Sequence, residues 1–127
     1  MPNRIVKTSR YSYADTIAKL SAAITGGGNT TFATIDQAAA AQGVGLSLRP
    51  TTLIVFGNPK GGTGLMAAFP LAALDLPLKV LVWEEQGVVS VAYVPPEEIA
   101  ARYNVTGMDA LIANMSHALD ALTNLVV

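Results

Sequence analysis

The sequence predicts an α+β fold, a mostly antiparallel sheet with its helices packed on one face. Segments with strand character are grouped in the middle of the chain, and they include a hairpin pattern. The long helical patterns lie toward the two ends. Chains that separate strands from helices in this way form antiparallel sheets backed by helices. The regular strand–helix alternation of a doubly wound nucleotide-binding fold is not found in the sequence.

The length and composition predict one globular domain over residues 1–127. A chain of this length and of 13.2 kDa is large enough to bury a core of its own. Apolar residues make up 51% of the sequence, which argues against disorder. Alanine, valine and leucine supply most of this share. Part of such an apolar surface can be covered in a homodimer, which we expect here.

The first elements are a strand, a helix and a second strand. Residues 4–9 alternate weakly, as a short strand does. Ser12 and Asp15 form a capping-box pattern at the start of a helix that the glycines at 26–28 end. Residues 30–35 are rich in β-branched side chains and predict a second strand. The apolar face of the helix consists of Tyr13, Ile17, Leu20 and Ile24.

A short helix and a buried strand follow. Asp36 is placed to cap an alanine-rich helix at 37–42, which Gly43 closes. Residues 43–50 are expected to be extended. The nearly continuous apolar run at 51–57 predicts a buried strand.

A hairpin and a proline-initiated helix come next. Residues 78–85 and 88–94 are two strand patterns separated only by Gln86 and Gly87, a two-residue hairpin connection. Pro95 and Pro96 end the second strand, and proline suits the first turn of a helix at 97–103.

The last helix is predicted over residues 107–126. Thr106 and Asp109 form a second capping-box pattern before it. His117 lies on the polar face of this helix, where we expect a solvated side chain near Asp120. The apolar stripe consists of Met108, Leu111, Ile112, Met115, Leu119, Leu122 and Leu125.

Charge and residue counts exclude several classes of function. The net charge is −1, and the charged residues are scattered. A nucleic-acid-binding protein needs a clustered basic face, so we expect no nucleic-acid partner. The chain has no cysteine and one histidine, so we expect no metal site and no cofactor. We find neither a signal-peptide pattern nor a good membrane span and therefore expect a cytoplasmic protein without a membrane partner.

The segment FGNPKGGTGLM at 56–66 resembles a phosphate-binding loop but lacks its functional groups. A P-loop needs a lysine that reaches the phosphates and a Ser or Thr hydroxyl that binds Mg²⁺. Leu65 and Met66 stand at these two positions. We therefore do not expect a P-loop NTPase.

Two interpretations of this segment remain open. It is either a wide turn leading to a short helix at 64–69 that Thr63 caps, or a ligand-binding loop. Long connections between strands are often functional, and a helix start next to glycines can hold an anion. The candidate ligand-binding residues of the loop are Asn58, Lys60, Gly61, Gly62 and Thr63.

Other candidates lie outside the loop. Asp36 can orient a ligand in addition to capping a helix. Asp75 lies in the apolar run LDLPLK and needs a partner, for which Lys79, Lys60 and Arg49 are available. The expected walls of a pocket or interface are Leu65, Met66 and Trp83.

Five segments resemble the family called domain of unknown function 302. They are IDQAAAA, LRPT, FGNPKGGTGLM, LDLPLKVLVWE and PPEEIAARY, and the resemblance covers most of residues 10–104. It implies a β-α-β(4)-α-like fold of the TATA-binding-protein-like class, often in homodimers. It implies no activity. The chain departs from the family pattern at Gln37, Gly64 and Val94-Pro95, where the family has a histidine, a proline and a polar pair.

Three functions are consistent with these observations. The first is a binding or accessory module that holds a small anionic or polar molecule between the loop, Asp36 and Asp75. The second is an enzyme in which Asp36 or Asp75 acts as acid or base and Lys60 stabilises charge. The third is a homodimeric interaction protein. Since no catalytic set of residues is found, the sequence favours binding over catalysis.

Overall fold

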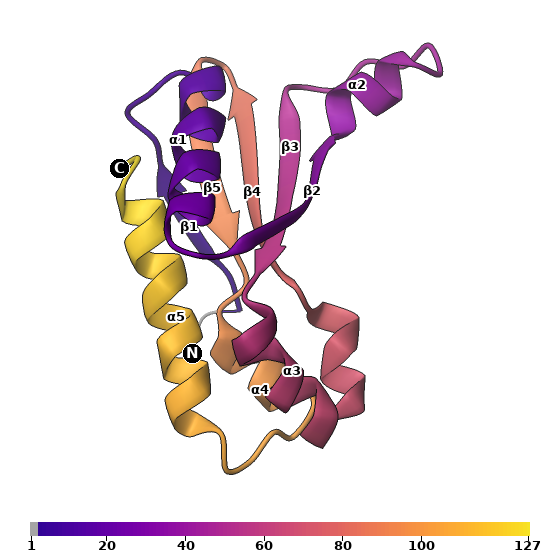
Figure 1. The fold of residues 1–127 in the computed structure, drawn as a ribbon. Helices are drawn as coiled ribbons and strands as arrows, with labels where there is room; N and C mark the ends of the chain where they lie inside the picture. The colour runs from indigo at the N-terminus through magenta and orange to yellow at the C-terminus, as the bar shows by residue number, and fades with distance from the viewer. Residues whose placement is uncertain (1–2) are drawn as a thin grey trace.

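The computed structural model describes residues 3–127, which form one five-stranded antiparallel sheet with helices (Figure 1). The spatial order of the strands is β1-β5-β4-β3-β2. The predicted fold class is therefore confirmed. In chain order the elements are β1 (Ile5–Thr8), α1 (Tyr13–Gly26), β2 (Thr30–Asp36), α2 (Gln37–Gln42), β3 (Thr51–Gly57), α3 (Pro59–Ala68), the 3-10 helix η1 (Pro70–Asp75), β4 (Leu78–Glu85), β5 (Val88–Tyr93), α4 (Pro96–Arg102) and α5 (Asp109–Asn124).

The sheet has one covered face and one open face. Burial alternates along the central strands, as a sheet with one packed side requires. Helices α1 and α5 lie in front of the sheet in Figure 1 and cover one face. The main core between them consists of Leu20, Ile24, Ile54, Phe56, Leu78, Val80, Val82, Val89, Val91, Tyr93, Leu119, Leu122 and Val126.

The β4–β5 hairpin turns on two residues, as predicted. Gln86 and Gly87 have φ values of 51° and 79°. Positive φ at both central positions matches the right-handed twist of the flanking strands, and glycine adopts it without strain. The turn fixes the pairing of Glu85 with Val88 and of Trp83 with Ser90.

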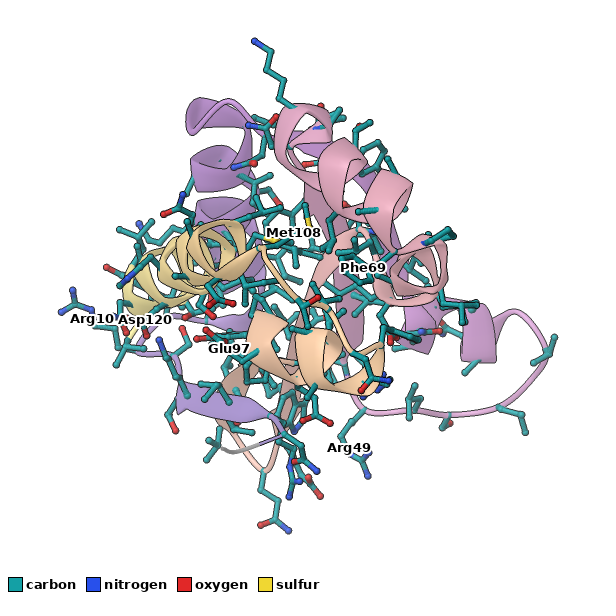
Figure 2. All side chains as sticks on the ribbon, turned by 90° about the horizontal axis from the view of Figure 1, so that it is seen from below. Arg10, Arg49, Phe69, Glu97, Met108 and Asp120 are labelled. Atoms are coloured by element: carbon teal, nitrogen blue, oxygen red, sulfur yellow. The ribbon has the colours of Figure 1, made fainter. Side chains whose placement is uncertain are left out.

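A second, smaller core lies at the end of the sheet where α3, η1, α4 and the start of α5 meet. Leu65, Ala72 and Ile112 are buried in it. Phe69 and Met108 pack against this cluster and are labelled in the view from below (Figure 2). The cluster ties the 59–75 connection to the C-terminal helices.

Lysine 7 joins the edge strand β1 to the C-terminal end of α5. Its ammonium group donates to the Asp120 carboxylate, Thr123 Oγ1 and Asn124 Oδ1, each at 2.8 Å. Only 16% of its side chain is exposed. The hydrogen bond and charge of Lys7 lower the pKa of Asp120. This cluster is structural, since its polar groups satisfy one another.

Two predicted helix starts are wrong. The helix expected at 64–69 begins at Pro59, because the Asn58 side chain caps it by accepting from the Lys60 amide at 3.0 Å. The last helix begins at Asp109, with Met108 at the cap position and no side-chain cap bond. The capping box of Thr106 and Asp109 is therefore not formed. Residues 107 and 108 precede the helix, and Gly107 has a φ of 75°.

Over residues 3–127, no helix combines the length and the apolar character needed to cross a membrane.

Candidate functional site

The segment 37–50, which we call the arm, projects from the body of the protein beside the β2–β3 edge (Figure 1). It consists of α2 and the connection to β3, and no residue of α2 is buried. Backbone hydrogen bonds fold it on itself: the amide of Leu46 donates to the carbonyl of Ala41 at 2.9 Å. Between the arm and the start of α1 lies an open cavity of about 380 Å³. It is lined by Tyr13, Asp36, Ala38, Ala39, Gln42, Leu46, Ser47, Leu48 and Pro50.

Asp36 has a defined position in this arm cavity. Its Oδ1 accepts from the amide of Ala39 at 2.9 Å, which confirms the predicted N-cap. No ion pair to Asp36 is present within residues 3–127. One oxygen of the Asp36 carboxylate therefore caps α2. Among the described residues, no lysine, arginine or histidine neutralises the charge of this carboxylate.

Tyr13 connects the arm cavity to the sheet. Its hydroxyl is hydrogen-bonded to the Thr52 hydroxyl at 2.5 Å, and Thr52 pairs with Asp36 across the β2–β3 ladder. Thr52 is buried, so this hydrogen bond holds the Tyr13 hydroxyl in a fixed position. Gln42 and Ser47 add two further polar side chains to a cavity that also has an apolar wall. Small-molecule sites commonly combine an apolar wall with a few polar groups.

The glycine-rich segment forms the first turns of α3. The amides of Gly61 and Gly62 both donate to the carbonyl of Asn58 at 3.0 Å, and the Thr63 hydroxyl donates to the carbonyl of Pro59 at 2.6 Å. Since the Lys60 amide is bonded to the Asn58 side chain, these polar groups already have partners within the helix start. The exposed Lys60 side chain extends from this turn.

Asp75 lies in a different cluster at the end of η1. Its Oδ2 accepts from the Tyr103 hydroxyl and from the Arg102 guanidinium, both at 2.6 Å. These hydrogen bonds, with the Arg102 charge, lower the pKa of Asp75 against the opposing effect of burial. The predicted need for a partner is confirmed, but the partner is not Lys79, Lys60 or Arg49. Lys79 donates instead to the backbone carbonyls of residues 75 and 77.

The structure separates the candidates that the sequence analysis grouped. Asp36 is at one end of β2, opposite Thr52, whereas Gly57, just before Asn58, pairs with Thr30 at the other end. Six residues along a strand correspond to about 20 Å. One pocket therefore cannot include both Asp36 and the start of α3. For the same reason, Asp36 cannot act as the acid–base partner of a group next to Lys60.

The three wall candidates also lie in different places. Leu65 has no exposed surface and belongs to the second core. Met66 is half-buried on α3, next to Gly62. Trp83 is half-buried on the open face of the sheet, where it pairs with Thr51 and Ser90.

Sequence reasoning missed several residues that the fold brings to these clusters. Tyr13 was assigned only to the apolar face of α1, and Gln42 and Ser47 carry no motif. Arg102 and Tyr103 are 27 and 28 residues from Asp75 in the chain. Only the IDQAAAA segment, which contains Asp36, gave a signal for the cavity.

A second cavity of about 300 Å³ lies between α4 and α5, lined by Glu97, Ala100, Val105, Asp109, Ile112 and Ala113. Glu97 is occupied by a hydrogen bond from the Ser116 hydroxyl. Within residues 3–127, no group of three or more His, Cys, Asp or Glu side chains is arranged to hold a metal ion. The arm cavity is therefore the better candidate site.

Comparisons with known proteins agree with the fold. A family model described as "Domain of unknown function DUF302" matches residues 5–122. A crystal structure of an uncharacterized conserved DUF302 protein from Bacillus stearothermophilus superimposes with a TM-score of 0.91 at 17% identity, over 100% of both chains.

Three curated relatives are named fluoride-specific ion channels. They are FluC 1 of Brucella suis, FluC 1 of Brucella abortus and FluC 2 of Brucella melitensis. Each is 40% identical over 98 residues, which is 76% of this chain. This chain spans 39% of the length of the first and 36% of the other two.

Proposed function

The chain belongs to the family described as domain of unknown function DUF302, and we propose that residues 1–127 act as a cytoplasmic, homodimeric module that binds a small polar molecule in the arm cavity. One observation carries this proposal. The Asp36 carboxylate, which has no described ion-pair partner, faces a cavity with three further polar side chains and an apolar wall. The volume lies within the range of small-molecule sites.

The charge of the cavity indicates the chemistry of its ligand. Asp36 is the one carboxylate among the lining residues, and no lysine or arginine lines the cavity. An anion would be repelled there, whereas a positive charge or a hydrogen-bond donor would be attracted. We therefore favour a polar ligand with amine or hydroxyl donors over the anionic ligand considered for the start of α3.

The substitution Asp36→Asn tests this site. Asparagine caps helices as well as aspartate does, so α2 should stay folded while the carboxylate charge is lost. The experiment screens amines, amino alcohols and polyols by thermal shift and measures each hit by calorimetry. We expect Asp36→Asn to weaken binding of a cationic hit about tenfold, since one charge-assisted hydrogen bond contributes on the order of 1.5 kcal/mol.

Two variants define the control for this experiment. Asp15→Asn removes a carboxylate from the exposed first turn of α1 and should leave the affinity unchanged. The double variant Lys60→Ala with Thr63→Ala should also bind like the parent. If the double variant loses binding and Asp36→Asn keeps it, the ligand sits at the start of α3 and the cavity assignment is wrong.

The similarity to fluoride-channel proteins supports a second candidate. In this alternative, the module acts beside a fluoride-specific channel, as an accessory domain. The supporting observation is the 40% identity over 98 residues to parts of three proteins of that name. Deleting the gene for this protein should then lower the fluoride concentration that halves growth of its host, about twofold or more.

Growth with chloride in place of fluoride is the control for that measurement. A plasmid copy of the gene should restore fluoride tolerance. Unchanged fluoride tolerance in the deletion strain, in a host that carries a working fluoride exporter, would contradict the accessory role. The ligand-binding proposal would be unaffected, because it is tested on the purified protein.

A further inference from the structure

An apolar row crosses the full width of the open face of the sheet. One row of side chains runs across it through four strand pairings: Val6, Ala92, Leu81, Leu53 and Ile35. Val55 and Trp83 flank this row on β3 and β4. Val6 is 53% exposed and Ile35 is 40% exposed, while the central residues are half-buried by one another. Neither hydrophobic core cluster includes these residues.

This surface is too large to be incidental. Five strands about 4.8 Å apart and about 20 Å long cover on the order of 500 Å² in projection. Part of this area is polar, at Lys79, Glu85, Thr51 and Ser90, and the apolar row crosses its middle. Scattered apolar residues are normal on a monomer, whereas a contiguous apolar row across a whole sheet is typical of an interface. The sheet face alone supplies more than half of the roughly 800 Å² per partner that a standard-size interface buries.

Opposite charges stand at the two ends of β4 on the open face. Lys79 lies at one end and Glu85 at the other, with Leu81 and Trp83 between them. Within the chain, Lys79 donates only to backbone carbonyls, and Glu85 lies 3.8 Å from the exposed Arg49. Two sheets that pack face to face keep their strands roughly aligned. A two-fold axis across the strands, between Leu81 and Trp83, makes the two β4 strands antiparallel and brings each Lys79 toward the partner's Glu85. An axis along the strands would oppose Lys79 to Lys79.

We infer that two copies of this chain associate through their open sheet faces, with the β4 strands antiparallel across a two-fold axis. The inference rests on the proposed homodimer and specifies its interface. A self-complementary patch of this kind is what a closed two-fold dimer requires. Leu81 of one protomer then packs against Trp83 of the other, and the apolar row leaves water.

The substitution Ile35→Glu tests the interface by placing a charge in the apolar row. Because Ile35 is 40% exposed on the strand β2 at the sheet edge, the variant should fold. Sedimentation equilibrium should give twice the chain mass of 13.2 kDa for the parent and the chain mass for the variant. We expect the dimer dissociation constant to rise at least a hundredfold. Val6→Glu, on the opposite edge strand, should act in the same direction.

The control substitution is Leu125→Glu. Leu125 is 55% exposed at the end of α5, which packs on the covered face, so this variant should remain a dimer. A monomeric parent at the highest concentration reached would overturn both the homodimer and this interface. A dimer that survives Ile35→Glu and Val6→Glu would overturn the interface but keep the homodimer. Ligand binding is also measured on the monomeric variant, so that the arm-cavity site is tested independently of the dimer interface.

Trp83 supplies an independent readout, since it is the one tryptophan of the chain. In the proposed dimer its indole is shielded, so acrylamide should quench its fluorescence at least twofold less in the parent than in monomeric Ile35→Glu. Equal quenching in dimer and monomer would overturn the interface. For the orientation of the axis, Glu85→Lys should weaken the dimer, and adding Lys79→Glu should restore it. A double variant no tighter than Glu85→Lys would overturn that orientation.

Discussion

Replacing Leu65 with alanine is expected to lower the free energy of unfolding by about 3 kcal/mol. Leu65 has no exposed surface and lies with Ala72 and Ile112 in the second core. Truncation removes apolar contacts and leaves a cavity, because α3 and η1 are held on several sides and cannot close over it. Urea unfolding followed by circular dichroism measures the change, with the denaturant slope confirming that the folded state is equally compact.

Leu71→Ala is the matched control for this prediction. Leu71 lies on η1, close in sequence, but is 67% exposed. Its truncation should change the unfolding free energy by less than about 0.5 kcal/mol. A Leu65→Ala cost as small as that of Leu71→Ala would mean that α3 does not pack against the C-terminal helices. The same result would return Leu65 to the pocket or interface wall that its place in the sequence suggested.

The fold could be predicted because its signals are local. The Gln86-Gly87 turn sets the register of β4 and β5, and each central strand carries the alternation of a sheet with one covered face. Asp36 caps α2 within three residues, and Ser12 caps α1 in the same way. Helix caps, tight turns and the alternation of buried residues each depend on residues close together in the chain, so a sequence pattern predicts them.

The start of α3 was mispredicted for a physical reason. Three glycines in its first six residues disfavour a helix by about 1 kcal/mol each relative to alanine, so the segment has the composition of a turn. The helix forms because Asn58 caps it and because burial of Leu65 outweighs the poor propensity. A tertiary contact decided the local structure, and no local signal reports such a contact.

The candidate site was only partly predictable because its members are distant in the chain. Asp36 was identified from its own segment. Tyr13 reaches the arm cavity because α1 packs beside β3, where the Tyr13 hydroxyl meets Thr52. Grouping Asp36 with the glycine-rich segment was wrong because the two lie at opposite ends of β2 and β3. Their relative placement depends on strand direction, which the candidate residues do not encode.

Replacing Asp75 with asparagine is expected to lower the free energy of unfolding at pH 7 by about 1.5 kcal/mol. The substitution keeps the size and one acceptor oxygen but removes the charge that the Tyr103 hydroxyl and the Arg102 guanidinium bind. The effect is at the low end for charged hydrogen bonds because 27% of the Asp75 side chain is exposed. Asp109→Asn, in the exposed first turn of α5, is the control and should change little.

The loss should also depend on pH, and its direction follows from the pKa of Asp75. Folding lowers this pKa below its ordinary value of 3.8, because Tyr103 and Arg102 bind the ionised form. The stabilisation is therefore fully present above the unfolded pKa and disappears as the pH falls through the folded pKa. Thermal unfolding of parent and variant should differ most near neutral pH and converge below pH 3.8. A difference that persists at low pH would show that packing, and not charge, holds η1 against α4.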